Sequence, residues 1–212
     1  MKTYQTGNIR NVVLLGSSKS GKTTLAEAMM FEGKVIDRRG TIEAKNTVSD
    51  NTEVEQIYQR SIYSTPLYTE FMENKLNIID TPGQDDFVGG VISGFKVADA
   101  GVMIVNATQG VEVGTEIFAR YADQYKMPLI IGVNQLDSEK ASWETTIDSL
   151  KQTFGNKVVP VQFPVAVGPG FDGFVDVLKQ KLYRFKDENG TREDLEIPAE
   201  FADQAEEYRL AL

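Results

Sequence analysis

The sequence predicts an α/β fold with a mixed, mostly parallel sheet and helices on both of its faces. Strand-like apolar runs alternate along the chain with helix-like segments of about 10–15 residues, the pattern of parallel strands joined by helices. One pair of strand-like runs is separated by only three residues and predicts an antiparallel hairpin instead. With 212 residues, of which 41% are hydrophobic, the chain is large enough to bury a substantial core.

The first elements follow from local pattern. Residues 11–15 are a short apolar run and predict a buried strand. Residues 24–32 place apolar side chains at helical spacing, and Gly33 is a suitable helix end. Residues 34–64 keep no period and predict a long irregular segment, which in compact domains is usually functional or disordered.

The remaining elements continue the alternation. Past residue 185 the chain becomes polar, and Pro198 is expected to open a last, acidic helix. In parallel sheets, ligands bind where strands end, which draws attention to the loops beginning at Gly16, Asp80, Ala107 and Asn134. The predicted elements are hairpin strands at 66–71 and 75–80, strands at 101–106, 128–133 and 158–165, and helices near 86–97, 112–125, 143–154 and 171–182.

The composition excludes several kinds of chemistry. The chain has no histidine and no cysteine, so it has no Ser-His-Asp or Cys-His machinery, no zinc site of the usual kind and no disulfide. A bound metal must then be a hard cation held by oxygen, for which magnesium is the obvious candidate. Proton transfer must use a carboxylate, lysine, tyrosine or water.

The charge is concentrated at the end of the chain. Residues 187–212 contain nine acidic and two basic side chains, which is −7 of the total −9 and leaves −2 for the rest. Neither part resembles the basic surface of a nucleic-acid-binding protein, so no DNA partner is expected. No apolar run is long enough for a signal peptide or a membrane span, and we expect a cytoplasmic protein without a membrane partner.

A phosphate-binding loop is predicted at residues 16–23. The sequence Gly-Ser-Ser-Lys-Ser-Gly-Lys-Thr fits G-x-x-x-x-G-K-[ST] and lies between the first predicted strand and the first predicted helix, as the motif requires. Its backbone N–H groups and the helix N-terminus favour an anion. Lys22 would reach the β- and γ-phosphates, and the Thr23 hydroxyl would take one magnesium position.

Two further motifs select the nucleotide. Asp80-Thr81-Pro82-Gly83 ends a predicted strand, where the carboxylate can hold a magnesium-bound water and the glycine N–H can approach a γ-phosphate. Asn134-Gln135-Leu136-Asp137 ends another predicted strand, and a carboxylate at Asp137 can accept both N–H donors on the Watson–Crick edge of guanine. The order and spacing of the three motifs predict a GTP-binding domain and conflict with an ATPase or kinase.

The chain resembles the G domain of elongation factor G, a translational GTPase, from about residue 9 to its end. The matching segments are residues 9–11, 77–83, 86–87, 110–112, 133–134 and 163–164. The resemblance implies a P-loop NTPase G-domain fold, GTP or GDP with Mg²⁺ as cofactors, and a monomer that meets the RNA factor-binding site and the stalk protein of the ribosome during translocation. Ribosomal-protection factors and peptide release factor 3 share these motifs.

The resemblance also predicts the domain organisation. Residues 1–165 would be the G-domain core, and 166–212 would begin an inserted subdomain, because residues 196–198 followed by an acidic helix resemble its start. The family's fifth guanine-binding element is not found after residue 186. The chain is therefore expected to be an N-terminal piece of a larger factor.

The resemblance implies site residues at the positions of this sequence that align with the family's motifs. Lys22 and Gln84 are the expected catalytic residues, and Thr23 and Asp80 are the expected magnesium ligands. The predicted nucleotide-binding residues are Ser17, Ser18, Lys19, Ser20, Gly21, Lys22, Thr23, Thr24, Asp80, Thr81, Pro82, Gly83, Gln84, Asn134, Gln135, Leu136 and Asp137.

Two departures from the family concern hydrolysis. Gln84 stands where the family has a water-positioning histidine, although glutamine orients water in Ras-like GTPases. The family's switch I carries Arg-Gly-Ile-Thr, and the aligned segment ends at Tyr63, whose phenol cannot place its oxygen where a threonine hydroxyl lies. Thr65 would substitute only if the loop shifts.

Two further departures concern binding. Lys19 replaces an aspartate that helps to hold a monovalent cation in the family; either its ammonium occupies the place of that cation or it is a solvated side chain at a loop tip. Gln135 replaces a lysine whose stem packs along the base, which lowers the expected affinity but leaves guanine selection to Asp137.

Two functional hypotheses follow. One is a ribosome-triggered GTPase acting in translocation, and the other is a guanine-nucleotide-binding ribosome module that does not hydrolyse. The altered residues predict weak or absent intrinsic GTPase activity with binding retained, since lost water positioning costs about 10²–10⁴ in rate. The acidic tail is either a solvated helix face or a docking surface for the stalk protein, with Glu206 and Glu207 as test positions.

Overall fold

The computed structural model describes residues 2–187 and 190–212. Glu188, one of the acidic tail residues counted above, lies outside the described residues. By compactness the chain divides into two units, Met1–Val105 with Glu112–Asn134, and Asn106–Val111 with Gln135–Leu212. The division predicted at residue 165 stays a prediction.

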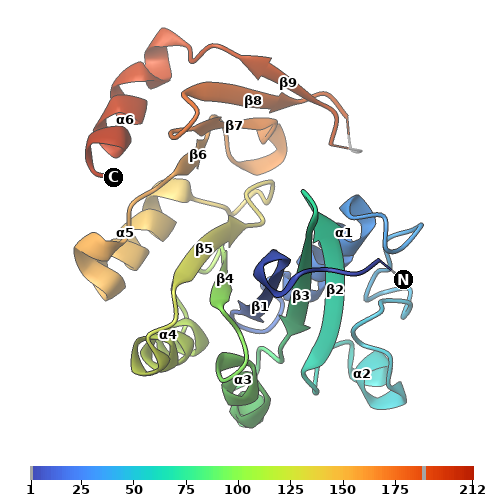
Figure 1. Ribbon diagram of the computed structural model, residues 1–212. Helices are drawn as coiled ribbons and strands as arrows, with labels where there is room; N and C mark the ends of the chain where they lie inside the picture. The colour runs from blue at the N-terminus through green and yellow to red at the C-terminus, as the bar shows by residue number, and fades with distance from the viewer. Residues whose placement is uncertain (1, 188–189) are drawn as a thin grey trace. The chain divides into compact units, whose positions relative to one another are not determined.

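The first unit contains a five-stranded sheet (Figure 1). Its elements in chain order are β1 (Ile9–Leu15), α1 (Lys22–Glu32), α2 (Glu53–Tyr58), β2 (Thr65–Phe71), β3 (Asn74–Asp80), α3 (Val88–Phe95), β4 (Ala100–Asn106), α4 (Val113–Tyr125) and β5 (Leu129–Asn134). The strand order is β2-β3-β1-β4-β5, with β1 parallel to both β3 and β4 and with β2 antiparallel to β3. The predicted mixed, mostly parallel sheet is confirmed.

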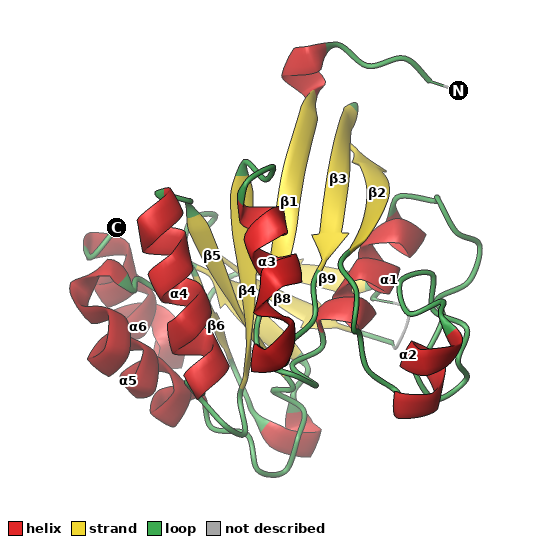
Figure 2. Cartoon of the chain, turned by 90° about the horizontal axis from the view of Figure 1, so that it is seen from below, coloured by secondary structure: helices red, strands yellow, loops and turns green. Residues whose placement is uncertain are grey.

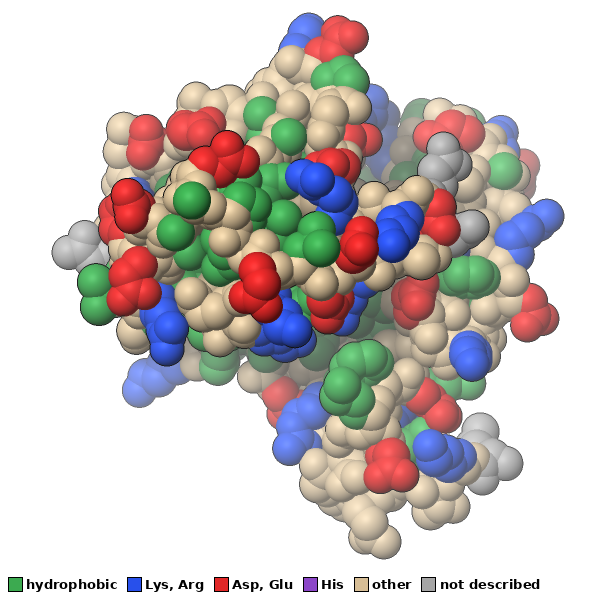
Figure 3. Space-filling model, turned by 90° about the horizontal axis from the view of Figure 1, so that it is seen from above, with side chains coloured by type: hydrophobic (Ala, Val, Ile, Leu, Met, Phe, Trp, Pro, Cys, Tyr) green, Lys and Arg blue, Asp and Glu red, His purple; other side chains and the backbone are tan. Residues whose placement is uncertain are grey.

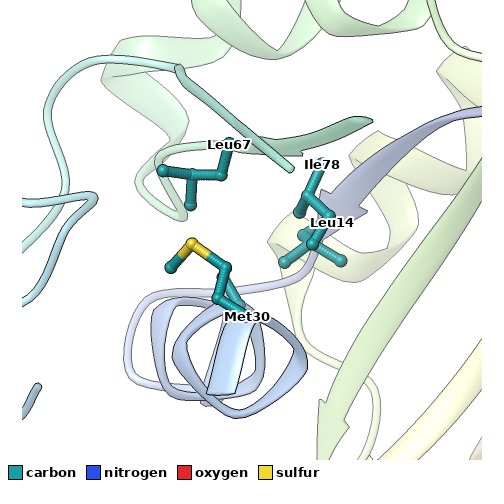
Figure 4. Packing of buried hydrophobic residues seen from close by; sticks show 5 residues of the cluster. Leu14, Met30, Leu67 and Ile78 are labelled. Atoms are coloured by element: carbon teal, nitrogen blue, oxygen red, sulfur yellow. The ribbon is translucent and has the colours of Figure 1, made fainter. Parts of the chain in front are cut away.

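Alternate side chains of β1 bury against different helices. One core cluster contains Leu14, Ala26, Met30, Leu67 and Ile78, and so joins α1 to strands β1, β2 and β3 (Figure 4). The neighbouring Val13 meets α3 instead, since a Cβ added at Gly94 would lie 2.8 Å from a Val13 methyl carbon. Successive strand residues point to opposite faces, so α1 and α3 cover opposite faces of the sheet (Figure 2).

The segment predicted to be irregular, residues 34–64, is called switch I below. It contains one short helix, α2, which the sequence reading did not predict. The helix begins with a capping box, in which the Thr52 hydroxyl accepts from the Glu55 N–H and the Glu55 carboxylate accepts from the Thr52 N–H. The rest of switch I has turns and bends without regular structure, as predicted.

The second unit contains a separate antiparallel sheet. Its elements are α5 (Trp143–Phe154), β6 (Gln162–Pro164), β7 (Gly173–Asp176), β8 (Lys181–Phe185), β9 (Arg192–Leu195) and α6 (Ala199–Leu210), with strand order β6-β7-β8-β9. The strand predicted at 158–165 is therefore shorter and belongs to this sheet. The last helix follows Pro198, as predicted, and packs Phe201 and Tyr208 against Phe163 at centroid distances of 6.2 and 5.5 Å.

The prediction of a helix at 171–182 is wrong, because this stretch contains β7 and the start of β8. Its apolar residues are compatible with a helical period, but the antiparallel pairing of β7 with β8 buries Val175 opposite Leu182. Between the strands, the Asp176 carboxylate accepts from the Lys179 N–H at 2.9 Å and stabilises the turn. Pairing across the turn overrides the local helical pattern.

The surface in Figure 3 carries acidic and basic side chains in an interspersed arrangement. Within the described parts of the chain, no helix combines the length and apolar character needed to cross a membrane.

Candidate nucleotide-binding site

The predicted phosphate loop joins β1 to α1 and depends on two glycines. Gly16 has φ +136° and Gly21 has φ +104°, conformations that side chains other than glycine rarely adopt. Each also lies against a neighbouring group: a Cβ at Gly16 would collide with the Ile104 carbonyl oxygen, and one at Gly21 would collide with the Asn134 amide nitrogen. The loop is thus fitted closely to β4 and to the end of β5.

Lys22 is enclosed by this loop. Only 5% of it is exposed, and its Nζ donates hydrogen bonds of 2.9 Å to the carbonyl oxygens of Gly16 and Ser17. Burial lowers the pKa of Lys22 to about 8, although the nearby Asp80, Asp50 and Glu112 carboxylates oppose that shift. The side chain is therefore still mostly charged at neutral pH and suited to an anionic partner.

Two serine hydroxyls of the same loop lack partners. Ser17 and Ser20 are 7% and 1% exposed, and neither Oγ has a hydrogen-bond partner. Buried hydroxyls are normally paired, and a native exception needs an explanation. Together with the Lys22 ammonium and the helix N-terminus, these groups fit an oxyanion such as a phosphate.

The loop is continuous with a cluster of oxygen atoms around Asp80, the last residue of β3. One carboxylate oxygen of Asp80 accepts from the Thr23 and Ser49 hydroxyls at 2.7 Å each, and the Ser61 hydroxyl lies 3.2 Å from that of Thr23. Asp80 is fully buried, and its other carboxylate oxygen has no partner. The predicted pair Thr23 and Asp80 is thus brought together.

Asp50 adds a second buried carboxylate to this cluster. It is 4% exposed, and neither of its carboxylate oxygens has a hydrogen-bond partner. Burial raises the pKa of Asp50 to about 6, with the nearby Ser61 hydroxyl opposing that shift. Burial likewise raises the pKa of Asp80, against the effect of the Ser49 and Thr23 hydroxyls and Lys22.

This donor set fits magnesium in combination with a phosphate. The donors are all oxygens, which Mg²⁺ prefers, and the unpartnered carboxylate oxygens supply compensating charge. Among the described residues, no group of three or more acidic side chains converges as a metal cage. Mg²⁺ usually binds through one or two carboxylates plus substrate phosphates, so such a cage is not required.

The turn after β3 lies directly on the phosphate loop. A Cβ at Gly83 would be 2.5 Å from Lys22 Nζ and 2.6 Å from the backbone nitrogen of Ser18, so only glycine fits there. Thr81 is buried and donates its hydroxyl to the Leu14 carbonyl at 2.6 Å, and Pro82 is also buried. Gln84, the expected water-positioning residue, follows in a half-buried position before a 3-10 turn.

The other predicted loop residues lie toward the solvent. Ser18, Lys19 and Thr24 are exposed, and Lys19 has a positive φ of 62°. The two hypotheses for Lys19, replacement of a cation and a solvated loop tip, both remain predictions.

The residues of the predicted base-recognition motif are divided between the two units. Asn134 belongs to the first unit and donates its side-chain amide to the Ser20 carbonyl at 2.8 Å, which ties the end of β5 to the phosphate loop. The next three residues belong to the second unit. There Gln135 accepts from the Asn106 amide at 2.8 Å, the Leu136 carbonyl accepts from the Gly168 N–H at 2.7 Å, and Asp137 is exposed.

Several residues of the candidate site were not predicted from the sequence, and they lie in switch I. Ser49, Asp50 and Ser61 join the oxygen cluster, but no short motif marks them. Two buried glutamates that anchor this segment were also missed. Glu27 of α1 accepts from the backbone N–H groups of residues 40 and 48 at 2.8 and 2.6 Å.

Glu55 of α2 is the second anchor. It is 1% exposed and accepts from the Ile62 and Tyr63 N–H groups at 3.0 and 3.1 Å. Part of its role could have been predicted from the sequence, because Thr52-x-x-Glu55 is the signature of a capping box at a helix start. The contacts to residues 62 and 63 are not local and leave no such signal.

Comparison with known proteins identifies related sequences. The family model for the elongation factor Tu GTP binding domain matches residues 7–199. An elongation factor G-like protein of Thermotoga maritima is 36% identical over 94% of this chain and 28% of its own length, and elongation factor G of Mycoplasma pneumoniae is 33% identical over 100% of this chain and 31% of its own.

A solved structure agrees with these relatives. The crystal structure of a protein from Thermus thermophilus superimposes with a TM-score of 0.88 at 31% identity, over 95% of this chain and 30% of that one. The chain thus spans under a third of the length of these relatives. The predicted resemblance and fold class are confirmed.

Proposed function

The chain belongs to the family of the elongation factor Tu GTP binding domain, and from that premise we propose that it binds GTP and GDP with Mg²⁺ as the nucleotide-binding part of an elongation factor G-like translation factor. The observation that carries the proposal is the phosphate loop. It encloses a buried lysine, two unpartnered hydroxyls and an adjacent Thr23–Asp80 pair.

Each part of the loop has a role in this proposal. The loop N–H groups and Lys22 bind the β- and γ-phosphates, with the ammonium exchanging its bonds to Gly16 and Ser17 for phosphate oxygens. Thr23 and Asp80 hold the magnesium ion, directly or through water. When bound, magnesium neutralises charge on the phosphates.

Guanine selection is assigned to the motif at the end of β5. The Asp137 carboxylate accepts both N–H donors of guanine, and Asn134 braces the phosphate loop through its bond to Ser20. Gln135 replaces the lysine found in the family. Its side chain is bonded to Asn106, so we expect it to contribute less to stacking on the base.

Hydrolysis is proposed to be weak. Gln84 is the residue available to orient water, in place of the family's histidine, and Tyr63 stands at the aligned position of the switch I threonine. A nucleotide-binding module without hydrolysis is the second candidate, favoured by the 59% exposure of Tyr63. Phosphate release on ribosomes separates the two, and Gln84→His is expected to raise a weak rate.

The proposed partner is the ribosome, in translocation, which places the site of action in the cytoplasm. Helix α6 supports a role for the acidic tail, because its inner face packs on Phe163 while Glu206 and Glu207 are exposed. A docking surface for basic residues of the stalk protein is therefore sterically open. Stalk binding unchanged by neutral substitutions at Glu206 and Glu207 would leave only the solvated-face explanation.

Nucleotide titration tests the proposal. Fluorescent GDP and GTP should bind in the presence of Mg²⁺, and ATP should bind about 10- to 100-fold more weakly. Lys22→Ala should weaken guanine-nucleotide binding at least about 30-fold. Asp137→Asn should reduce the preference over ATP, with the exposed Glu139→Gln as a control. A chain that binds neither nucleotide would refute the proposal.

A further inference from the structure

The end of switch I is arranged differently from what the motif alignment predicts. The alignment puts Tyr63 at the position of the family's threonine. In the structure, Tyr63 is 59% exposed, whereas its backbone N–H is held by Glu55. Thr65, the substitute considered from the sequence, donates its hydroxyl to the Ser49 carbonyl at 3.3 Å. Neither hydroxyl group has a bond to Thr23 or Asp80.

Ser61 is the residue of this stretch that reaches the oxygen cluster. Its hydroxyl oxygen lies 3.2 Å from that of Thr23, which in turn donates to Asp80 at 2.7 Å. It also lies beside the Asp50 carboxylate, whose pKa it lowers against the larger effect of burial. Ser61 therefore adjoins Thr23, one of the two proposed magnesium ligands, and also the Asp50 carboxylate.

The position of Ser61 is set by the backbone that follows it. The buried Glu55 carboxylate accepts from the N–H groups of the next two residues, Ile62 and Tyr63. Glu55 itself is fixed by the capping box with Thr52 at the start of α2. These bonds turn the Ser61 side chain inward and leave the Tyr63 side chain outside.

We propose that Ser61, rather than Tyr63 or Thr65, supplies the switch I hydroxyl to the magnesium ion of the bound nucleotide. This inference rests on the proposed function and refines it. A serine hydroxyl is a small oxygen donor that suits the octahedral shell of Mg²⁺. The replacement of threonine by Tyr63 then does not remove the switch I contact, because the contact is made two residues earlier.

Ser49 is the rival hydroxyl. It is 1% exposed and donates to the same Asp80 oxygen as Thr23, at 2.7 Å. Its hydrogen bond is to Asp80, so we assign it the role of orienting that carboxylate. Because the Thr23 hydroxyl gives its proton to Asp80, Ser61 is the donor in its contact with Thr23 and keeps its lone pairs for a cation beside that proposed ligand.

The test is an isosteric pair at Ser61. Ser61→Thr keeps a hydroxyl, and Ser61→Val has nearly the same shape without one. Magnesium is titrated against release of a fluorescent, non-hydrolysable GTP analogue from the 212-residue chain. We expect Ser61→Val to need roughly tenfold more Mg²⁺ for half-maximal retention and Ser61→Thr to behave like wild type. Tyr63→Phe and Thr65→Val should leave the titration unchanged.

Tryptic cleavage after the exposed Arg60 provides a readout that is independent of nucleotide release. The analogue with Mg²⁺ should protect this bond in wild type and in Ser61→Thr, and protect it less in Ser61→Val. Equal magnesium dependence in Ser61→Val and wild type would overturn the inference, as would an equally large effect of Tyr63→Phe or Thr65→Val. Failure of the wild-type chain to bind the analogue would instead refute the proposed function.

Discussion

Two pairs of buried carboxylates lie in the first unit, and they differ in how their oxygens are paired. Glu27 and Glu55, the anchoring pair, each accept hydrogen bonds from backbone N–H groups of switch I on both carboxylate oxygens. Asp50 and Asp80, the site pair, keep three carboxylate oxygens without partners.

This difference indicates that the anchoring pair stabilises the fold and that the site pair is suited to binding a ligand. Burial raises the pKa of Asp50 and Asp80, because too few donors compensate for the lost hydration. Burial acts on Glu55 in the same direction, but the hydrogen bonds from Thr52, Ile62 and Tyr63 outweigh it and hold its pKa below the ordinary value. A satisfied carboxylate stabilises the fold, whereas an unsatisfied one is available to a cation.

The largest effect on stability is expected at the anchoring pair. Glu27→Ala removes the acceptor for two backbone N–H groups and should lower the free energy of unfolding by about 2–4 kcal/mol. Chemical denaturation measures this change, with Glu32→Ala on the exposed side of the same helix as the control. If the two variants were equally stable, the anchoring role of Glu27 would be wrong.

The site pair should behave in the opposite way. Asp80→Asn removes a buried charge that has an unpartnered oxygen, so stability should stay within about 1 kcal/mol of wild type or rise. Magnesium-dependent binding of GDP should nevertheless weaken about 10- to 100-fold. Asp203→Asn makes the same charge change on the exposed surface of α6 and serves as the control. A loss of stability without a loss of binding would contradict the comparison.

A smaller, local effect is expected at Glu55. Glu55→Ala frees the N–H groups of residues 62 and 63, so switch I should open more often and trypsin should cut after Arg60 about tenfold faster. The exposed Glu53→Ala, in the first turn of the same helix, should leave the cleavage rate unchanged. Equal rates in both variants would show that Glu55 does not hold this segment.

The smallest effect concerns pH. Because the pKa of Glu55 is lowered on folding, its contribution to stability is complete above its ordinary pKa of 4.5 and disappears as pH falls through its lower folded value. The stability difference between wild type and Glu55→Gln should therefore be constant from neutral pH down to about 4.5 and should shrink below it. A difference that grows on acidification would have the wrong sign.

Sequence patterns correctly predicted much of the sheet and of the phosphate loop. The glycines and Lys22 of the phosphate loop and the meeting of Thr23 with Asp80 follow from short motifs at strand ends, and the parallel strands follow from the alternation of strand-like and helix-like segments. The turn at Gly83 was also foreseen, because a glycine after the aspartate can approach the phosphates.

Two features could not be predicted from the sequence pattern. The segment at 171–182 has apolar residues at helical spacing, but β8 pairs with β7 across a short turn, and the strands replace the predicted helix. Ser61 reaches Thr23 across 38 positions, and its hydroxyl is placed by Glu55 rather than by any feature of its own neighbours. The motif alignment placed Tyr63 at the position of the family's switch I threonine, because an alignment compares positions in the sequence and not the directions of side chains.

Nucleotide binding is tested most directly by a titration of the wild-type chain with fluorescent GDP, with and without Mg²⁺, in competition with ATP or GTP. We expect binding that strengthens with Mg²⁺, weakens strongly in Lys22→Ala and is competed by GTP far better than by ATP. Binding that ATP competes equally well, or that is unaffected by Lys22→Ala, would contradict it.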